Sequence, residues 1–394
     1  MSVMNFDLPE SAERFRSDLR KFLDEELPDW WTHLFNVDER VPGFTVELCR
    51  KLAERNWLTM AWPREFGGQD ADIWMRMVLN EEMRYIGEPR GSHYMCINYI
   101  GPLIMQVGTP EQRERFLKPM ATGDALWCQG FSEPGAGSDL AALQTKAIDN
   151  GKCFVVNGQK IWTSYATHAE WCLLIARSDP DSKRHKGLSV FALDMKSPGI
   201  TVRPIDSLGG PSEINELFFE DVEIPYDCLL GPVHEGWSVI VNALANERLG
   251  IAFHAYILDP FDKLLEYVKT TEDEDGRLLS ERPSVRAGLV RMYARWRAAR
   301  MLFYRVAADF ELGNTDVVGP AISKVFASEA AMFAADVAFN VLGPKAQLGE
   351  YDASAPLAGL AVNQWVYTIP TLIAAGTNEI QRNIIAQRGL GLPR

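Results

Sequence analysis

The 394-residue sequence lacks a basic excess and any long apolar run. Its 40 Lys and Arg residues face 53 Asp and Glu residues, and the formal net charge is −13. Binding to nucleic acid or to an anionic membrane would have to overcome this repulsion. Because no 18 consecutive residues are all apolar, the simplest sign of a transmembrane helix is also missing. We therefore expect neither a nucleic acid nor a membrane as a partner.

Cysteine is scarce, and its spacing is uninformative about metals or redox chemistry. The six cysteines form no C-x-x-C pair and are diluted over a long chain, which favours reduced intracellular thiols over a disulfide framework. The N-terminus carries Asp7, Glu10 and Glu13 before any apolar run, unlike a signal peptide or a transit peptide. The predicted location is the cytoplasm.

Several common catalytic motifs are missing. The sequence has no P-loop, no H-E-x-x-H and no G-x-S-x-G, and its six histidines lack a zinc-binding spacing. These absences remove local support for nucleoside triphosphate chemistry, zinc hydrolysis and serine hydrolysis. We expect no metal site.

The spacing of apolar residues changes twice along the chain. Residues 1–125 show helical spacing, 126–235 show short β-rich runs, and 236–394 return to helical spacing. Without βαβ alternation, a Rossmann domain is excluded. The pattern predicts a mainly α chain with a central antiparallel β domain, a barrel or sandwich. Within that domain, Asn157-Gly158 predicts a hairpin turn between two short strands.

A glycine-rich segment, EPGAGSD at 133–139, follows the first β-rich run. Its two glycines permit close backbone approach, and its N–H groups with the hydroxyls of Ser132 and Ser138 suit an anionic group. Taken alone, the segment is better explained as a surface turn between a helix and the sheet.

Two further motifs change that interpretation. The sequence carries GFSEPGAGSD at 130–139, VNGQKIWTS at 156–164 and AGTNEIQR at 375–382. In order and spacing these resemble the acyl-CoA dehydrogenase flavoprotein family, and the resemblance spans essentially the whole chain. It implies a helical domain, a β domain and a C-terminal four-helix bundle. It also implies FAD as cofactor and an acyl-CoA as substrate.

The resemblance assigns the flavin contacts residue by residue. Trp162 matches the tryptophan beside the isoalloxazine, Ser164 matches the hydroxyl that bonds flavin N5, and Ser138 matches a contact to flavin or CoA phosphate. Glu379 stands where the family more often has an amide. The implied cofactor-binding set is Gln129, Phe131, Ser132, Ser138, Trp162, Ser164, Thr377 and Glu379.

The catalytic base departs from the commoner family pattern. Many members carry a glutamate where this chain has Ala375, and a second branch places the base in an E-R-L sequence, here Glu247-Arg248-Leu249. The resemblance therefore implies Glu247 as base and Arg248 as a CoA contact. On a helix, Glu247 also interrupts an apolar stripe, a setting that raises a carboxyl pKa. The alternatives are that Glu247 pairs with an arginine of another helix and that Arg248 is a surface residue.

The implied reaction is FAD-dependent removal of an α-proton and a β-hydride from an acyl-CoA, giving the trans-2-enoyl-CoA. The enolate oxygen needs aimed hydrogen-bond donors as negative charge develops on it, and the resemblance implies that the backbone N–H at position 375 is one of them. That donor survives the change from glutamate to Ala375. Electron-transfer flavoprotein is the expected acceptor.

The assembly prediction rests on further departures. Where homotetrameric members carry an arginine, a phenylalanine and a glutamine that reach a neighbour's FAD, this chain has Glu272, Asp275 and Pro283, and Pro344 replaces a glycine. The resemblance is thus to bacterial heteromeric members that act on steroid side-chain CoA thioesters. We expect an α2β2 assembly with a related subunit, two flavins and a bulky or steroid side-chain substrate.

Other readings stay open at this point. One is a homotetramer acting on simple or branched fatty acyl-CoA, and others are an acyl-CoA oxidase or a flavin- or CoA-binding non-catalytic subunit. Arginines interleaved with aromatics over 286–305 also suggest nucleic acid binding, although a solvated helix face or a grip on cofactor phosphates explains them as well.

Overall fold

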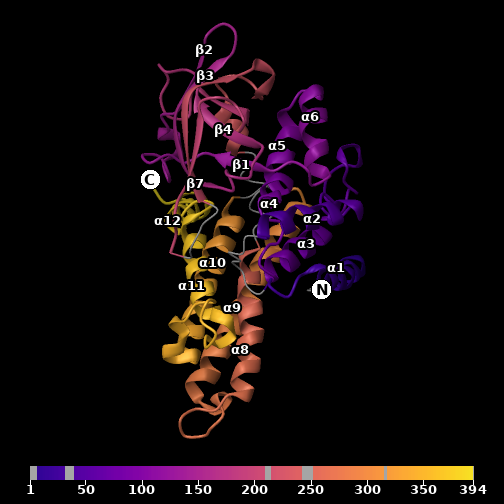
Figure 1. Cartoon of the computed structure of the whole chain (residues 1–394), viewed down its shortest axis with the longest axis vertical. Helices are drawn as coiled ribbons and strands as arrows, with labels where there is room; N and C mark the ends of the chain where they lie inside the picture. The colour runs from indigo at the N-terminus through magenta and orange to yellow at the C-terminus, as the bar shows by residue number, and fades with distance from the viewer. Residues whose placement is uncertain (1–6, 32–39, 209–213, 242–251, 315–316, 394) are drawn as a thin grey trace. The chain divides into compact units, whose positions relative to one another are not determined.

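The computed structural model describes residues 7–31, 40–208, 214–241, 252–314 and 317–393. The chain divides into two compact units, each described by itself below. The helical unit comprises residues 1–36, 72–89 and 249–394, and the sheet unit comprises 37–71 and 90–248. Figure 1 labels their α-helices and several of their strands.

The helical unit is built from long helices and short connecting turns. The helices are α1 (Glu10–Glu26), α3 (Ile73–Tyr85), α8 (Leu258–Thr270), α9 (Pro283–Glu311), α10 (Val318–Leu342), α11 (Leu360–Ile373) and α12 (Asn378–Ile384). Shorter turns are η5 (Phe253–Ile257), η6 (Leu279–Glu281), η7 (Gly343–Gln347), η8 (Pro356–Gly359) and η9 (Ile385–Gly389).

The longest helix, α9, owes its packing to a regular apolar stripe. Its buried residues recur at alternating intervals of four and three, which places them on one face of a helix. They include Val285, Leu289, Met292, Trp296, Ala299 and Phe303. This face packs on α10, and a Cβ added at Gly288 of α9 would lie 3.4 Å from the Val337 side chain of α10. In Figure 1, α9, α10 and α11 run side by side.

Two helical stretches are long and apolar enough to span a membrane by length and composition, Val318–Gln347 and Pro356–Gly389. In the first, 56% of the most apolar window is buried inside the structure, and in the second 33%. The buried residues of α10 are mostly alanines packed against α9 and α11. A buried core helix of a soluble protein can be as long and as apolar as these stretches, so they are weak support for a membrane span.

The sheet unit combines helices with one eight-stranded sheet. Its helices are α2 (Val41–Glu54), α4 (His93–Met95), α5 (Gly101–Val107) and α6 (Pro110–Ala121), with η1 (Arg64–Phe66), η2 (Cys96–Ile100), η3 (Leu140–Ala142) and η4 (Tyr226–Cys228). The strands are β1 (Trp127–Gly130), β2 (Lys146–Asp149), β3 (Phe154–Ser164), β4 (Trp171–Arg177), β5 (Leu188–Asp194), β6 (Ile200–Pro204), β7 (Ile214–Ile224) and β8 (Leu229–Leu230). A further helical stretch is described over 236–241.

The sheet is mixed, whereas the sequence predicted a purely antiparallel one. Its order is β6-β7-β3-β2-β4-β5-β8, and β1 pairs with β4. Pairs β1·β4 and β2·β4 are parallel, and the remaining pairs are antiparallel. The expectation failed because β1 and β2 are each far from β4 in the sequence. Local turn signals say nothing about pairing between such distant strands. The predicted class, a mainly helical chain with a central β region, is confirmed.

The predicted hairpin at Asn157-Gly158 is wrong. Residues 154–164 form one continuous strand, β3, and both of its halves pair with β7. Gly158 has φ of 150° and marks a register shift in that pairing. A Cβ there would lie 2.7 Å from the Thr145 Cα. Glycine is therefore required by a β-bulge and by the close approach of the Thr145 backbone, not by a turn.

All six cysteines lie in the sheet unit, and all are buried free thiols. Burial raises the pKa of Cys96 to about 12 and that of Cys228 to about 11. They act as small apolar residues, as the sequence suggested. Among the residues that the structure describes, no group of three His, Cys, Asp or Glu side chains is placed to hold a metal ion.

Candidate functional site

The glycine-rich segment begins where β1 ends and is anchored by its glutamate. The backbones of Glu133 and Ala136 exchange two hydrogen bonds of 3.0 Å, which closes a tight turn. The Glu133 carboxylate points inward and accepts hydrogen bonds from the backbone N–H groups of Gln144 at 2.6 Å and Thr145 at 2.9 Å. The turn is therefore fixed from inside the protein.

A buried lysine completes this anchor. Lys160 on β3 has a fully buried side chain, and its Nζ donates to Glu133 Oε1 at 2.9 Å and to the Phe131 carbonyl at 3.0 Å. Burial lowers the pKa of Lys160 and opposes the effect of Glu133. Burial also pushes the pKa of Glu133 upward, but Lys160 and the backbone donors outweigh it and leave that pKa below its usual value. The pair thus links β3 to the start of the turn, a role that sequence reasoning missed.

The outer side of the same turn is open. A Cβ added at Gly135 or Gly137 would meet nothing within 4 Å, so packing within this chain does not require glycine there. Ser138 is exposed beside them. The segment presents its backbone and one hydroxyl to solvent, which suits close approach by a ligand.

Trp162 on β3 has an unusual backbone and an unusual exposure. Its φ is 62°, and its side chain is 61% exposed. The pairing of β3 with β7 shifts register between Lys160 and Thr163, so Trp162 stands out at a bulge. Its neighbour Ile161 donates its N–H to the Ser132 carbonyl at 2.9 Å, which holds this part of β3 beside the glycine-rich segment. A non-glycine residue in this region costs about 1–3 kcal/mol, and such residues cluster at binding sites.

The other predicted cofactor residues of the sheet unit vary in exposure. The Tyr99 hydroxyl donates to the side-chain oxygen of Gln129, Phe131 is buried, and Ser132 and Ser164 are half-buried. The six residues predicted in this unit lie on β1, on the segment that follows it and on β3. Hydrogen bonds from 160 and 161 to 131–133 bring these two stretches together.

Two predicted cofactor residues lie at the start of α12 in the helical unit. Thr377 is the N-cap, and its hydroxyl accepts from the Ile380 N–H at 3.2 Å. Glu379 is exposed and lies 3.8 Å from Arg382. Its pKa is lowered by a backbone N–H and by Thr377, as expected for a carboxylate in the first turn of a helix. Thr377 therefore already has a structural role within the chain.

The residues before this N-cap adopt left-handed backbone conformations. Ala375 has φ of 55° and Gly376 has φ of 80°. The Gln381 side-chain amide donates to the carbonyls of both, at 2.9 Å and 3.4 Å. Nothing in the local sequence predicts the backbone strain at Ala375, since alanine rarely adopts a left-handed conformation.

The predicted base Glu247 and the predicted CoA contact Arg248 lie outside the described residues. The structure therefore does not test either assignment.

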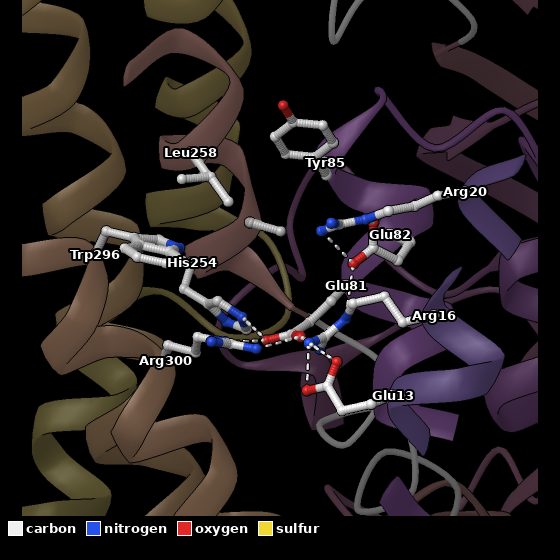
Figure 2. A pocket seen from close by; sticks show the side chains of 11 residues that line it. Glu13, Arg16, Arg20, Glu81, Glu82, Tyr85, His254, Leu258, Trp296 and Arg300 are labelled. Carbon is white, nitrogen blue, oxygen red and sulfur yellow. Dashed lines mark hydrogen bonds and ion pairs between the residues drawn. The ribbon is translucent and has the colours of Figure 1, made fainter. Parts of the chain in front are cut away.

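A cavity of about 200 Å³ in the helical unit is lined by charged side chains that the sequence did not connect. Figure 2 shows them pointing toward one another from α1, α3, η5 and α9. The Glu81 carboxylate contacts His254 at 2.7 Å, Arg16 at 2.8 Å and Arg300 at 3.0 Å. Burial alone would raise the pKa of Glu81, but His254 and Arg300 outweigh it and lower that pKa to about 2.

Glu82 forms the second centre of this cluster. It binds Arg20 at 2.7 Å and Arg16 at 3.0 Å. The arginines of 286–305 were expected on a solvated face or against a ligand, yet Arg300 is an internal partner of Glu81 and Arg295 lies 4.1 Å over the Phe333 ring. Because its acidic side chains are paired with basic ones, we interpret this cluster as a set of ion pairs that hold α1, α3, η5 and α9 together.

The chain matches three domain families in order. They are acyl-CoA dehydrogenase, N-terminal domain, over residues 9–124, the middle domain over 128–222 and the C-terminal domain over 234–390. It is 33% identical to acyl-CoA dehydrogenase FadE26 of Mycobacterium tuberculosis over 356 residues, which is 88% of each chain. It is also 33% identical to acyl-CoA dehydrogenase IpdE1 of the same organism over 405 aligned positions, covering 98% of this chain and 99% of that one.

Solved structures give the same result. The ChsE4-ChsE5 complex from Mycobacterium tuberculosis contains a similar chain at 30% identity and a TM-score of 0.91, covering 99% of this chain and all of that one. The Tcur3481-Tcur3483 steroid ACAD also reaches a TM-score of 0.91, at 29% identity and the same coverage.

The fold and the comparisons define an oxidoreductase acting on acyl-CoA. The chain belongs to the acyl-CoA dehydrogenase family. The three-part fold expected from the sequence motifs is confirmed. The boundaries at 125 and 235 stay a prediction.

Proposed function

We propose that this chain carries out FAD-dependent α,β-dehydrogenation of an acyl-CoA with a bulky or steroid-type side chain. The observation that carries the proposal is Trp162, an exposed aromatic ring in a left-handed conformation beside an open glycine-rich turn. A large exposed indole held at such a conformation is hard to explain by the packing of this chain, and a flat aromatic ligand explains it.

The residues present fit a flavin. Trp162 offers a ring face, Ser164 a half-buried hydroxyl, and the 135–137 backbone an approach free of side chains. Ser138 offers an exposed hydroxyl for a phosphate oxygen, with Gln129, Phe131 and Ser132 on the adjoining strand and turn. In the helical unit, Thr377 and Glu379 are proposed as further contacts. When bound, FAD supplies an acceptor for the hydride.

The proposed chemistry of the chain's own residues is a proton abstraction with stabilisation of the resulting charge. Glu247 takes the α-proton of the thioester, and Arg248 binds the CoA moiety. The backbone N–H of Ala375 donates to the thioester oxygen as negative charge develops there. Its left-handed conformation, held by Gln381, supports such a fixed donor. No acidic side chain is needed at 375.

The steroid-type substrate and the heteromeric assembly are the finer parts of the proposal. One structurally similar protein is described as a steroid ACAD and another as a complex of two chains. In this chain Glu272, Asp275 and Pro283, at the positions expected to reach a neighbour's FAD, are all exposed. Acids there would repel a pyrophosphate, so a related subunit is proposed to supply those contacts in an α2β2 enzyme with two flavins.

The proposed acceptor is electron-transfer flavoprotein, and the proposed location is the cytoplasm. An acyl-CoA oxidase would instead be reoxidised rapidly by air. A homotetramer would act on simple or branched fatty acyl-CoA, and a non-catalytic subunit would show no reduction of its flavin by any thioester.

The experiment that tests the base is the variant Glu247→Gln in the purified holoenzyme. Flavin absorbance is followed after mixing with steroid side-chain and straight-chain acyl-CoA thioesters under anaerobic conditions. We expect wild type to bleach fastest with the bulky thioester and the variant to bind it without bleaching, because an amide keeps the shape but not the basicity. Glu235→Gln, an exposed glutamate, is the matched control. Bleaching by Glu247→Gln at more than a small fraction of the wild-type rate would remove Glu247 as the base.

A further inference from the structure

Lys324 on α10 is a buried lysine whose hydrogen bonds, within the described part of the chain, go to an amide oxygen and a main-chain carbonyl. Its Nζ donates to the side-chain oxygen of Asn378 at 2.7 Å and to the main-chain carbonyl of Leu372 at 3.2 Å. The residue is 8% exposed. Burying an ammonium group costs free energy unless its N–H groups donate to suitable acceptors, so a lysine at this position calls for a structural or functional explanation.

Its two acceptors flank one short segment. Leu372 belongs to the last turn of α11, and Asn378 is the first residue of α12. Between them lies the connection 374–377, which contains the left-handed Ala375 and Gly376. A single ammonium group therefore ties the two ends of this connection together from α10.

The side-chain oxygen of Asn378 accepts a second hydrogen bond at this point. It is 3% exposed, and its side-chain oxygen also accepts from the Ser328 hydroxyl at 3.1 Å. Two donors from successive turns of α10 thus converge on one amide oxygen. The start of α12 is fixed to α10 through this oxygen, and the Gln381 side-chain amide donates to the carbonyls of Ala375 and Gly376 in the connection.

We infer that Lys324 is a positioning residue that clamps the 374–377 connection between α11 and α12 and so holds the backbone N–H of Ala375 in place. The inference rests on the proposed function, in which that N–H donates to the thioester oxygen. A charged donor to two carbonyl-type oxygens is stronger than a neutral one, which explains a lysine rather than an apolar residue here.

The surroundings make the clamp sensitive to pH. Burial lowers the pKa of Lys324 to about 8, with Glu379 and Glu329 opposing that effect and Arg382 adding to it. Arg295 of α9 and Asp336 of α10 line the adjoining cavity of about 370 Å³ together with these three residues. The ammonium form therefore predominates below about pH 8, and its charge is lost as the pH rises further.

The first experiment measures the connection itself and needs neither cofactor nor substrate. Hydrogen exchange of peptides covering 372–380 is compared between wild type and Lys324→Met, with the exposed Lys345→Met as matched control. We expect the protection of this segment to be about tenfold lower in Lys324→Met than in wild type. In Lys345→Met the protection should equal that of wild type.

Thermal unfolding distinguishes the positioning role from a role in global stability, for which Lys324→Met would lower the midpoint. Because the pKa of Lys324 is lowered in the folded state, its charge is disfavoured there, and Lys324→Met should leave the midpoint of thermal unfolding unchanged or higher. A large fall of the midpoint together with uniform loss of protection would overturn the positioning role. Unchanged protection over 372–380 would overturn it as well.

The second experiment uses the holoenzyme. Lys324→Met should slow flavin reduction about tenfold with little change in acyl-CoA affinity. The wild-type rate is expected to decline above pH 8 as the Lys324 charge is lost, and the rate of Lys324→Met should lack this decline. Asn378→Asp, which gives the ammonium a carboxylate partner, should move that decline upward by about one pH unit. An identical alkaline decline in wild type and Lys324→Met would overturn the inference. If wild type is not reduced by any acyl-CoA, the proposed function fails, while the exchange result still decides the clamp.

Discussion

At the residue scale, the Glu133–Lys160 pair shows how one motif residue serves the scaffold while its neighbours are left for a ligand. Glu133 and Lys160 are 7% and 0% exposed, and backbone N–H groups complete the carboxylate's hydrogen bonds. Removing one member leaves a buried charge without its counter-charge, which costs about 3–5 kcal/mol. Neutralising both members removes that penalty in part.

We therefore expect Lys160→Met to lower the free energy of unfolding by about 3–5 kcal/mol, and the double variant Lys160→Met/Glu133→Gln to lower it by less. Urea unfolding followed by circular dichroism measures both. Lys152→Met, an exposed lysine of the same unit, is the control. Equal effects of the single and double variants would show that the two side chains act independently.

Trp162 makes the opposite prediction, a large effect on ligand binding and a small one on stability. Its ring is 61% exposed, so Trp162→Ala should change the free energy of unfolding by less than about 0.5 kcal/mol. FAD should dissociate more readily, because the ring face is lost. Flavin fluorescence during dialysis measures this release. Tyr226→Ala, an exposed aromatic residue elsewhere in the unit, should retain FAD as wild type does, and equal retention by Trp162→Ala would remove Trp162 from the flavin site.

At the element scale, β3 depends on a glycine for its bulge. Gly158→Ala would place a Cβ 2.7 Å from the Thr145 Cα, whereas Gly151→Ala, also at positive φ, would meet nothing within 4 Å. We expect a loss of about 2 kcal/mol or more for Gly158→Ala and about 1 kcal/mol for Gly151→Ala, since only the first combines a clash with backbone strain. Thermal unfolding ranks the two variants. The reverse order would mean that the β3 backbone moves to relieve the clash.

The ion-pair cluster connects α1, α3, η5 and α9 and should respond to acid. The pKa of Glu81 is lowered from 4.5 to about 2, so its contribution to stability is complete above pH 4.5 and is lost as the pH falls toward 2. Glu81→Gln should weaken this part of the acid dependence of unfolding. Guanidine unfolding at pH 3 and pH 6 measures it, with Glu266→Gln, an exposed glutamate of α8, as control. The same acid dependence in Glu81→Gln would contradict the assignment.

The elements predictable from sequence were those that depend on local spacing. Helical period predicted the α9 region, and β-rich runs predicted the positions of β4, β5 and β6. The hairpin failed because Asn157-Gly158 suits a tight turn, while β7 offers a continuous partner to both halves of β3. Parallel pairing of β1 with β4 and the long-range contacts of Lys160, Glu81 and Lys324 depend on packing that local patterns do not encode.

At the scale of the whole molecule, the exposed acidic turn makes a prediction about assembly. Purified alone, the chain should bind clearly less than one FAD per chain, because Glu272 and Asp275 cannot complete a second copy of the site. Co-expression with a related acyl-CoA dehydrogenase subunit should give an α2β2 particle with two flavins. Light scattering and the ratio of flavin to protein absorbance measure both. A stable homotetramer with one FAD per chain and full turnover would exclude this assembly and the preference for a steroid-type substrate.

The placement of the six thiols offers a label for one half of the protein. Because Cys49, Cys96, Cys128, Cys153, Cys172 and Cys228 all belong to the sheet unit and are buried, an alkylating reagent reaches them only when that unit opens. The helical unit carries no cysteine and stays silent to the reagent. Mass spectrometry after timed alkylation therefore reports the opening of the sheet unit alone, and a flavin bound at Trp162 should slow it in proportion to its occupancy.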